Sequence, residues 1–216
     1  MIPLYDDNPT RRQALVVYAL IAVNVLVFLH QISLSNPQLV QFLRAWAVIP
    51  REFFAFTNRE VITLLSSQFL HGSWLHLIGN MWFLWIFGNN VEDRLGSVKF
   101  LIFYLICGAI AAITQSMFSP SSGIPLIGAS GAIAGVMGAY IVRFPRAEIV
   151  TLVPIFIILT TIRIPALFFL GIWLVGQTVY AAMSNPGQPG VAYLAHISGF
   201  VAGIILFKLF EDDREI

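Results

Sequence analysis

The sequence predicts an all-α integral membrane protein built as a bundle of six transmembrane helices. Three observations lead to this fold class: the composition, the length and spacing of the apolar stretches, and the distribution of positive charge between them. Of the 216 residues, 58% are hydrophobic and 11% are charged, whereas a water-soluble domain carries roughly 25% charged residues. This composition makes the lipid bilayer the expected partner of the chain. The net charge of +1 argues against a basic surface, so we expect no binding of nucleic acid.

Six apolar stretches approach the length of about 20 residues that crosses a bilayer as a helix. They cover residues 14–32, 74–90, 100–118, 125–142, 165–183 and 191–210. We therefore divide the chain into an N-terminal segment, 1–13, a six-helix domain, 14–210, and a C-terminal tail, 211–216. A seventh apolar stretch, 149–162, is shorter, rich in β-branched residues and interrupted by Pro154. These features favour an extended or re-entrant segment at the membrane interface.

The positive charges support six spans and orient them. With six spans, the side that holds both termini carries Arg11, Arg12, Arg94, Lys99, Arg143, Arg146, Arg163, Lys208 and Arg214, and the other side only Arg44, Arg51 and Arg59. The positive-inside rule then places both termini in the cytoplasm. The short chain shows no targeting peptide, so we expect a multi-pass protein of a plasma membrane, that of a bacterium.

Two segments between the predicted helices have unusual compositions. The long first loop, 33–72, carries a series of aromatic side chains, namely Phe42, Trp46, Phe53, Phe54 and Phe56. We expect this loop to be membrane-associated and to lie in the lipid headgroup layer. Residues 185–190 have the turn-rich sequence NPGQPG, which predicts a loop before the last helix.

A serine and a histidine stand out because they lie inside otherwise apolar segments. Polar groups at bilayer depth are costly and usually face the interior of a helix bundle. Ser130 and His196 form the smallest set that supplies a nucleophile and its general base. A structural interpretation is also open, because Ser130 and the nearby glycines form rows of small residues that let helices pack closely.

The other polar residues narrow the possible chemistry. All 11 acidic residues lie outside the predicted helix cores, which argues against proton-coupled transport and against two-aspartate hydrolysis. His71 and His76 are too far apart in register to share a helix face, and no HExxH motif occurs, so we expect no metal and no cofactor. His76 and Asn80 do share a face, and both can donate hydrogen bonds to an oxyanion; helix capping and packing are their alternative roles.

Four motifs, in order and with matching spacing, make the chain resemble the rhomboid family of intramembrane serine proteases. They are HLIGNM at 76–81, VEDRLG at 91–96, GASG at 128–131 and AHISGFVAG at 195–203, and the similarity runs from about residue 66 to 207. The resemblance implies a six-helix rhomboid bundle in which Ser130 is the nucleophile and His196 its general base. It also implies an oxyanion hole formed by Asn80, His76 and the backbone N–H of Ser130.

The resemblance implies structural roles for the remaining motif residues. Glu92 and Arg94 are expected to brace a loop through hydrogen bonds, and the expected packing and helix-start positions are Gly128, Gly131, Gly199 and Gly203. One position departs from the family: some members carry an aromatic residue one helical turn after the serine, where it packs on the histidine. That position is Ala134 here, so the sequence leaves open which group orients His196.

The function we expect is hydrolysis of peptide bonds in or near the transmembrane segments of protein substrates by the Ser–His dyad. Hydrolysis needs water, so the dyad must lie in a cavity, for which Gln68, Ser73, Thr114 and Gln115 are candidate lining residues. Two alternatives stay open. The chain could be a non-proteolytic relative that binds membrane clients, or a small transporter, for which the interrupted stretch 149–162 is the one hint.

Overall fold

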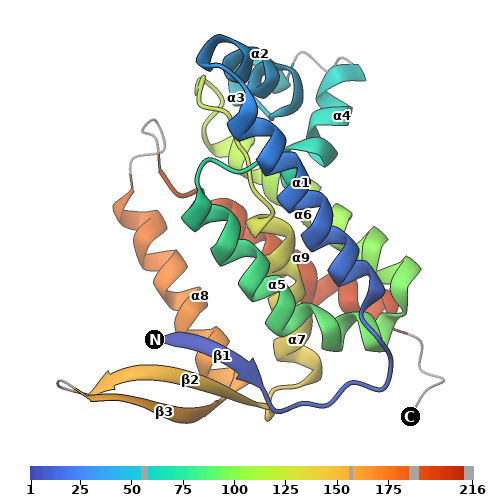
Figure 1. Cartoon of the computed structure of the whole chain (residues 1–216), viewed down its shortest axis with the longest axis vertical. Helices are drawn as coiled ribbons and strands as arrows, with labels where there is room; N and C mark the ends of the chain where they lie inside the picture. The colour runs from blue at the N-terminus through green and yellow to red at the C-terminus, as the bar shows by residue number, and fades with distance from the viewer. Residues whose placement is uncertain (55–57, 156–157, 185–189, 212–216) are drawn as a thin grey trace.

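Long helices packed side by side form the body of the structure (Figure 1). The computed structural model describes residues 1–54, 58–155, 158–184 and 190–211. The helices that correspond to the predicted spans are α1 (Leu15–Ser33), α5 (Trp74–Leu95), α6 (Ser97–Phe118), α7 (Ser130–Arg143), α8 (Ala166–Met183) and α9 (Tyr193–Phe210). Each predicted span therefore contains one helix, and the chain has the multi-pass helical membrane fold that its sequence predicts.

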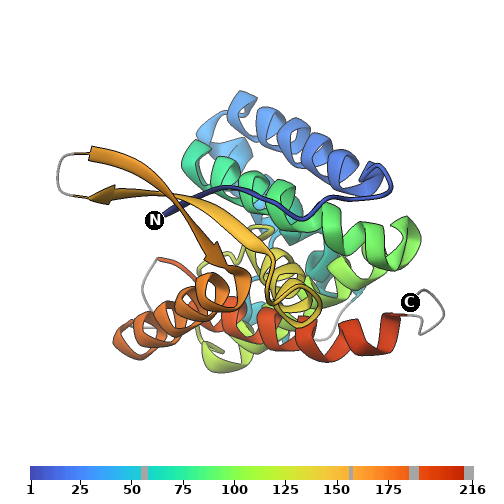
Figure 2. The same cartoon turned by 90° about the horizontal axis from the view of Figure 1, so that it is seen from below.

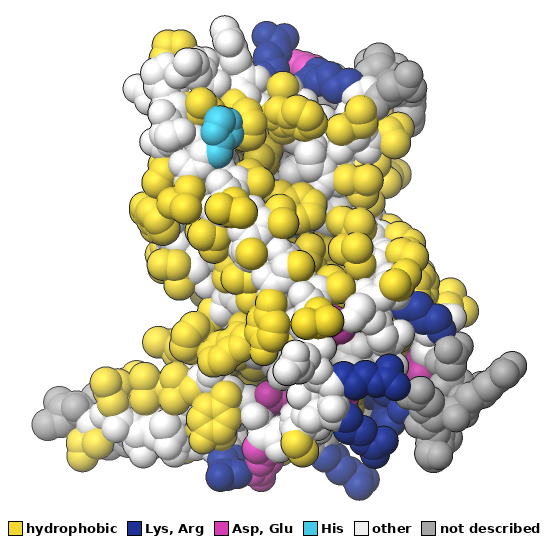
Figure 3. All heavy atoms as spheres, turned by 45° about the vertical axis from the view of Figure 1, so that its right-hand side comes forward, with side chains coloured by type: hydrophobic (Ala, Val, Ile, Leu, Met, Phe, Trp, Pro, Cys, Tyr) yellow, Lys and Arg dark blue, Asp and Glu magenta, His cyan; other side chains and the backbone are white. Residues whose placement is uncertain are grey.

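The surface agrees with a position across a bilayer. Among the described residues, α1, α6, α8 and α9 are long and apolar enough to cross a membrane, and α7 is a shorter apolar helix. The last turns of α5 carry Glu92, Asp93 and Arg94. Figure 3 shows apolar side chains over the middle of the molecule, between two ends at which the Lys and Arg side chains gather. Such a band is expected where lipid tails replace water.

The apolar stretch 125–142 is helical only from Ser130, where α7 begins, which is the helix start that Gly128 and Gly131 predict. The residues before it pair with the first loop: the Leu126 N–H donates to the Val48 carbonyl at 2.7 Å, and the Gly128 N–H donates to the Ser67 carbonyl at 2.9 Å. Gly128 has φ +121°, a backbone conformation that residues other than glycine rarely adopt. Ser130 is consequently the first residue of its helix.

A small antiparallel sheet closes the end of the bundle where α9 finishes (Figure 1). It consists of β1 (Ile2–Asp6), β2 (Glu148–Ile155) and β3 (Ile158–Pro165), in the order β1-β2-β3. In the β2–β3 hairpin Glu148 pairs with Pro165. The extended structure predicted for 149–162 is therefore present as a hairpin, whereas β1 was not predicted. Its sequence, IPLYD, shows no clear alternation of apolar and polar residues, and β1 forms against β2, which lies far along the chain.

The first loop folds into short helices at the opposite end of the molecule (Figure 1). These are α2 (Asn36–Trp46), α3 (Pro50–Phe53), α4 (Asn58–Ser66) and η1 (Ser67–Phe69). The Arg59 guanidinium bonds the Glu52 carboxylate at 3.0 Å and ties α4 to α3. Location of this loop in the headgroup layer stays a prediction. Phe56 and residues 185–189 of the predicted turn-rich loop lie outside the described residues.

Helix α7 occupies the centre of the bundle, and Figure 2 shows it between α5 and α9. Its residues from Gly131 to Tyr140 are all buried. It packs closely on α9, since a Cβ atom on Gly199 would overlap the carbonyl of Gly131, and one on Gly203 would overlap the carbonyl of Gly135. These glycines bring the two backbones into direct contact.

Glu92 offers a test of how the first helix is held. Glu92 is 2% exposed, and its carboxylate accepts hydrogen bonds from the Val16 and Val17 N–H groups at 2.9 and 2.8 Å, at the start of α1. Glu92→Ala leaves the part-buried Val16 N–H and the buried Val17 N–H without their acceptor, so we expect a loss of about 2–3 kcal/mol in the free energy of unfolding in mixed micelles. Asp93→Ala is the matched control, because Asp93 accepts the exposed N–H groups of Arg11 and Arg12. An equal loss for both variants would contradict this account.

Asp6 makes the packing of β1 on α7 sensitive to pH. Its carboxylate accepts a hydrogen bond from the Tyr140 hydroxyl at 2.6 Å, and burial raises the pKa of Asp6 to about 6. A raised pKa in the folded state stabilises the protein at low pH, and this contribution is lost as pH rises through 6. We therefore measure the difference in Tm between the wild type and Asp6→Asn. We expect this difference to decrease as the pH is raised from about 4 to about 7. A difference that does not change with pH would refute the assignment.

Candidate active site

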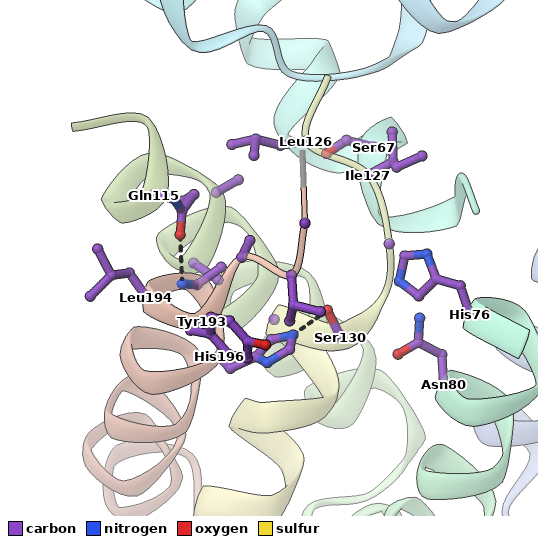
Figure 4. Close-up of a pocket in the computed structure, with 18 of the residues that line it drawn as sticks. Ser67, His76, Asn80, Gln115, Leu126, Ile127, Ser130, Tyr193, Leu194 and His196 are labelled. Carbon is purple, nitrogen blue, oxygen red and sulfur yellow. Dashed lines mark hydrogen bonds between the residues drawn. The ribbon is translucent and has the colours of Figure 1, made fainter. Parts of the chain in front are cut away.

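The loop before α7 and the start of that helix form the centre of the candidate site. Figure 4 shows Ser130 at the end of this loop, with His196 on one side and His76 and Asn80 on the other. The first N–H groups of a helix have no partner within the helix. The start of α7 therefore places both a hydroxyl and free backbone donors beside the same space.

Ser130 and His196 are brought into direct contact. The Ser130 Oγ lies 2.8 Å from the His196 Nε2, although the two residues are 66 positions apart in the chain. Both residues are half-buried, one at the start of α7 and the other in the first turn of α9. Their contact depends on the close approach of these helices at Gly131 and Gly199, because larger residues there would push the backbones apart. A hydroxyl bonded to an imidazole in this way has the arrangement of a nucleophile and its base.

Residues of α8 contact the His196 ring and answer the question, left open by the sequence, of which groups orient it. The Trp173 ring lies over the imidazole, with 5.9 Å between the ring centroids and 31° between the planes. The Gln177 Oε1 lies 2.7 Å from His196 Nδ1. Ala134 is fully buried, and an aromatic group from α8 packs on the ring. Sequence reasoning missed both α8 residues; their spacing of four in an otherwise apolar helix was the one available signal.

His76 and Asn80 lie together on α5, across the loop from His196 (Figure 4). A methyl group on Gly128 would lie 2.7 Å from His76 Nε2 and 3.7 Å from Asn80 Nδ2, so both nitrogen atoms border this glycine. The Gly72 N–H is directed at His76 Nδ1 at 3.5 Å, which leaves Nε2 as the protonated nitrogen. Asn80 Nδ2 is buried and has no hydrogen-bond partner among the described residues. Two donors therefore face the loop that carries Ser130.

These groups share one cavity of about 830 Å³, lined by Ser130, His196, His76 and Asn80. Of the expected lining residues, Gln68, Ser73 and Gln115 line it and Thr114 does not. Gln115 also fixes the start of α9, because its Oε1 accepts the Ala195 N–H at 3.2 Å (Figure 4). No group of three or more metal-binding side chains occurs within the described ranges.

Glu92 and Arg94 lie away from this cavity, whereas only some of the motif glycines do. Glu92 binds the start of α1 and also accepts the Ser97 hydroxyl at 2.7 Å. Arg94 pairs with Glu211 at 2.5 Å, at the end of α9. Of the glycines, Gly128 and Gly131 line the cavity, whereas Gly203 lies deeper in the contact between α7 and α9.

Comparison with known proteins identifies similar chains. The Rhomboid domain model matches residues 58–211. Rhomboid protein 1, mitochondrial, of Saccharomyces cerevisiae is 34% identical over 143 residues, which are 63% of this chain and 39% of that protein. Rhomboid-like protein 11, chloroplastic, of Arabidopsis thaliana is 26% identical over 155 residues, 67% of this chain and 51% of its own length. The human presenilin-associated rhomboid-like protein, mitochondrial, is 33% identical over 88 residues, 40% of this chain and 23% of its own.

These relatives overturn one prediction. The chain spans about half or less of their lengths, and they are named as mitochondrial and chloroplast proteins. The assignment to a bacterial plasma membrane with cytoplasmic termini is therefore wrong. That assignment rested on the lack of a recognisable targeting peptide. The other features, the length of the apolar stretches and the basic loops, occur in proteins of many membranes and do not identify one of them. The family itself is shown: the match over residues 58–211 covers more than half of the 216 residues, and the chain belongs to the rhomboid family.

Proposed function

We propose that this chain is an intramembrane serine endopeptidase that hydrolyses peptide bonds in or near the transmembrane segments of other proteins. The observation that carries the proposal is the 2.8 Å contact between Ser130 Oγ and His196 Nε2 inside the cavity. Family membership supports the same activity. The apolar middle of the face in Figure 3 suits substrates that are themselves embedded in the lipid bilayer.

In the proposed reaction, His196 Nε2 accepts the proton of the Ser130 hydroxyl while Oγ attacks the carbonyl carbon of the substrate. The carbonyl oxygen becomes an oxyanion in the tetrahedral intermediate. The imidazolium then gives its proton to the leaving amine as the C–N bond breaks, which leaves an acyl ester on Ser130. Water, deprotonated by His196, hydrolyses that ester and restores the enzyme. The cycle needs neither a metal nor a cofactor.

Asn80 Nδ2, His76 Nε2 and the Ser130 N–H are proposed as the oxyanion donors. The position of both side-chain nitrogen atoms beside Gly128 supports this role, as does the buried Asn80 Nδ2, which has no hydrogen-bond partner within the described residues. A donor that is already in place gains its hydrogen bond when negative charge develops, so it stabilises the transition state more than the ground state. For Glu92 and Arg94 we propose structural roles, supported by their contacts away from the dyad. For the motif glycines we also propose structural roles, supported by the backbone conformation of Gly128 and by the close contact of α7 with α9 at Gly131, Gly199 and Gly203.

The reactivity of Ser130 gives the most direct chemical test. A fluorophosphonate probe should label Ser130, and His196→Ala should abolish labelling because the hydroxyl loses its base. Ser198→Ala is the matched control, since the Ser198 hydroxyl donates to the Leu194 carbonyl at 2.7 Å and takes no part in the dyad. Intact-mass spectrometry would measure adduct formation. Labelling that survives His196→Ala at the wild-type rate would exclude this pair as nucleophile and base.

Proteolysis itself is tested with a model single-span substrate in detergent. The wild type should cleave it, whereas Ser130→Ala and His196→Ala should each lose activity by a factor of about 10³ or more, because each removes half of one catalytic unit. Product appearance on gels, with the cut site read by mass spectrometry, gives the result. Cleavage by both variants at the wild-type rate would reject the assignment. Absence of cleavage together with absence of probe labelling at Ser130 would favour a binder of membrane clients.

The oxyanion role of Asn80 has its own prediction. Asn80→Ala should lower kcat by about 10²- to 10³-fold and leave KM nearly unchanged, because the lost bond forms mainly in the transition state. Asn89→Ala removes a side-chain amide from the same helix but outside the cavity lining, and should keep full activity. Steady-state kinetics on the model substrate would separate the two parameters. A rise in KM alone would assign Asn80 to substrate binding.

A further inference from the structure

Helices α8 and α9 meet in a ladder of three side-chain pairs. In order along α8, the pairs are Trp173 with Phe200 at 6.0 Å between ring centroids, Gln177 with His196, and Tyr180 with Tyr193 at 5.5 Å. The spacing of four and three residues places all three α8 members on one helix face. The amide of Gln177 is thus held between two aromatic pairs, directly opposite the imidazole.

If His196 Nε2 acts as the base for Ser130, the ring proton of His196 lies on Nδ1, and this N–H needs a hydrogen-bond acceptor. A neutral histidine carries one ring proton, so a base at Nε2 must hold its proton on Nδ1. Nε2 of His196 faces Ser130 Oγ, which leaves Nδ1–H as a donor in need of a partner. The Gln177 Oε1, at 2.7 Å, is that partner. With the amide reversed, its NH₂ group would donate to Nδ1 and move the ring proton to Nε2, where it would abolish the base.

Other contacts of the ring do not supply this acceptor. In the described part of the chain, the recorded contacts of His196 besides Gln177 are the Ser130 hydroxyl and the rings of Trp173 and Tyr193. The two aromatic rings restrict the imidazole by packing, and the hydroxyl occupies Nε2. One helical turn after Ser130, α7 carries Ala134, whose side chain has no polar atom.

We infer that Gln177 is a positioning residue of the dyad: by accepting the Nδ1–H of His196 it selects the tautomer that can deprotonate Ser130. The same hydrogen bond strengthens when His196 becomes an imidazolium, because a charged donor makes a stronger bond than a neutral one. The catalytic consequence rests on the proposed protease function. The choice of tautomer does not, because it depends on the hydrogen bond alone.

Kinetics on the model substrate test the catalytic consequence. Gln177→Leu keeps the size of the side chain but removes the acceptor, and should lower kcat by about 10- to 100-fold with KM changed by less than about twofold. Gln177→Glu offers a carboxylate oxygen at the same place and should recover most of the lost kcat. Thr178→Val is the matched control on α8, because the Thr178 hydroxyl donates to the Leu174 carbonyl at 3.0 Å; it should behave as wild type.

The tautomer is measured independently by NMR of protein labelled with ¹⁵N-histidine in detergent micelles. The sequence has four histidines, and comparison with His196→Ala identifies the signals of His196. These should report Nδ1–H in the wild type and in Gln177→Glu, and a shift of population to Nε2–H in Gln177→Leu.

Two results would overturn the inference. One is a Gln177→Leu protein with unchanged tautomer and a kcat within about twofold of wild type. The other is equal loss of kcat in Gln177→Leu and Gln177→Glu with unchanged tautomer, which would mean that the residue acts only through packing. If the wild type cleaves no substrate, the proposed function fails, and the NMR comparison still decides whether Gln177 sets the tautomer.

Discussion

The direct contact between the backbones of α7 and α9 is the constraint on which the rest of the structure depends. Lipid tails are as apolar as leucine side chains, so helices in a bilayer gain little from hiding apolar surface and depend on close packing instead. Gly131 and Gly135 meet Gly199 and Gly203 at distances that no side chain would allow. This contact also sets the distance between Ser130 and His196, which lie at its outer end. The same packing therefore holds the bundle together and assembles the dyad.

The candidate site collects one contribution from each of several helices. The hydroxyl comes from α7, the imidazole from α9, the acceptor at Nδ1 from α8, and the two side-chain donors from α5. The first loop takes part as well, because its backbone carbonyl at Ser67 holds the loop that leads to Ser130. A site built in this way is rigid only to the extent that the helices keep their relative positions.

In the part of the chain that the structure describes, carboxylates lie at the ends of the bundle and not in its middle. Glu92 and Asp93 bind backbone N–H groups at and before the start of α1. Asp6 accepts the Tyr140 hydroxyl, and Asp7 pairs with Arg163 at 3.0 Å. Charge is costly at bilayer depth, so these groups act where water and polar backbone are available. They fasten the N-terminal segment and the sheet to the helices.

The sequence alone determined the membrane class, the six helices and the residues Ser130, His196, His76 and Asn80 as the chemical candidates. Composition and apolar length report burial in lipid, and a polar residue in an apolar stretch is conspicuous without any structure. The sequence indicated a helix start near Ser130 from Gly128 and Gly131, but not the hydrogen bonds to the first loop that hold the preceding segment. Nor could it identify the membrane in which the chain resides.

Only the tertiary structure decided what surrounds His196. In the sequence, Gln177 and Trp173 lie in an apolar helix and show no sign of a role beside His196. Ala134 is a small residue at the position where some family members carry an aromatic residue against the histidine. Their roles appear when α8 packs antiparallel to α9 and sets each side chain opposite its partner. The spacing of residues within one helix shows which of them lie on the same face. Which residues of another helix they contact depends on how the two helices pack.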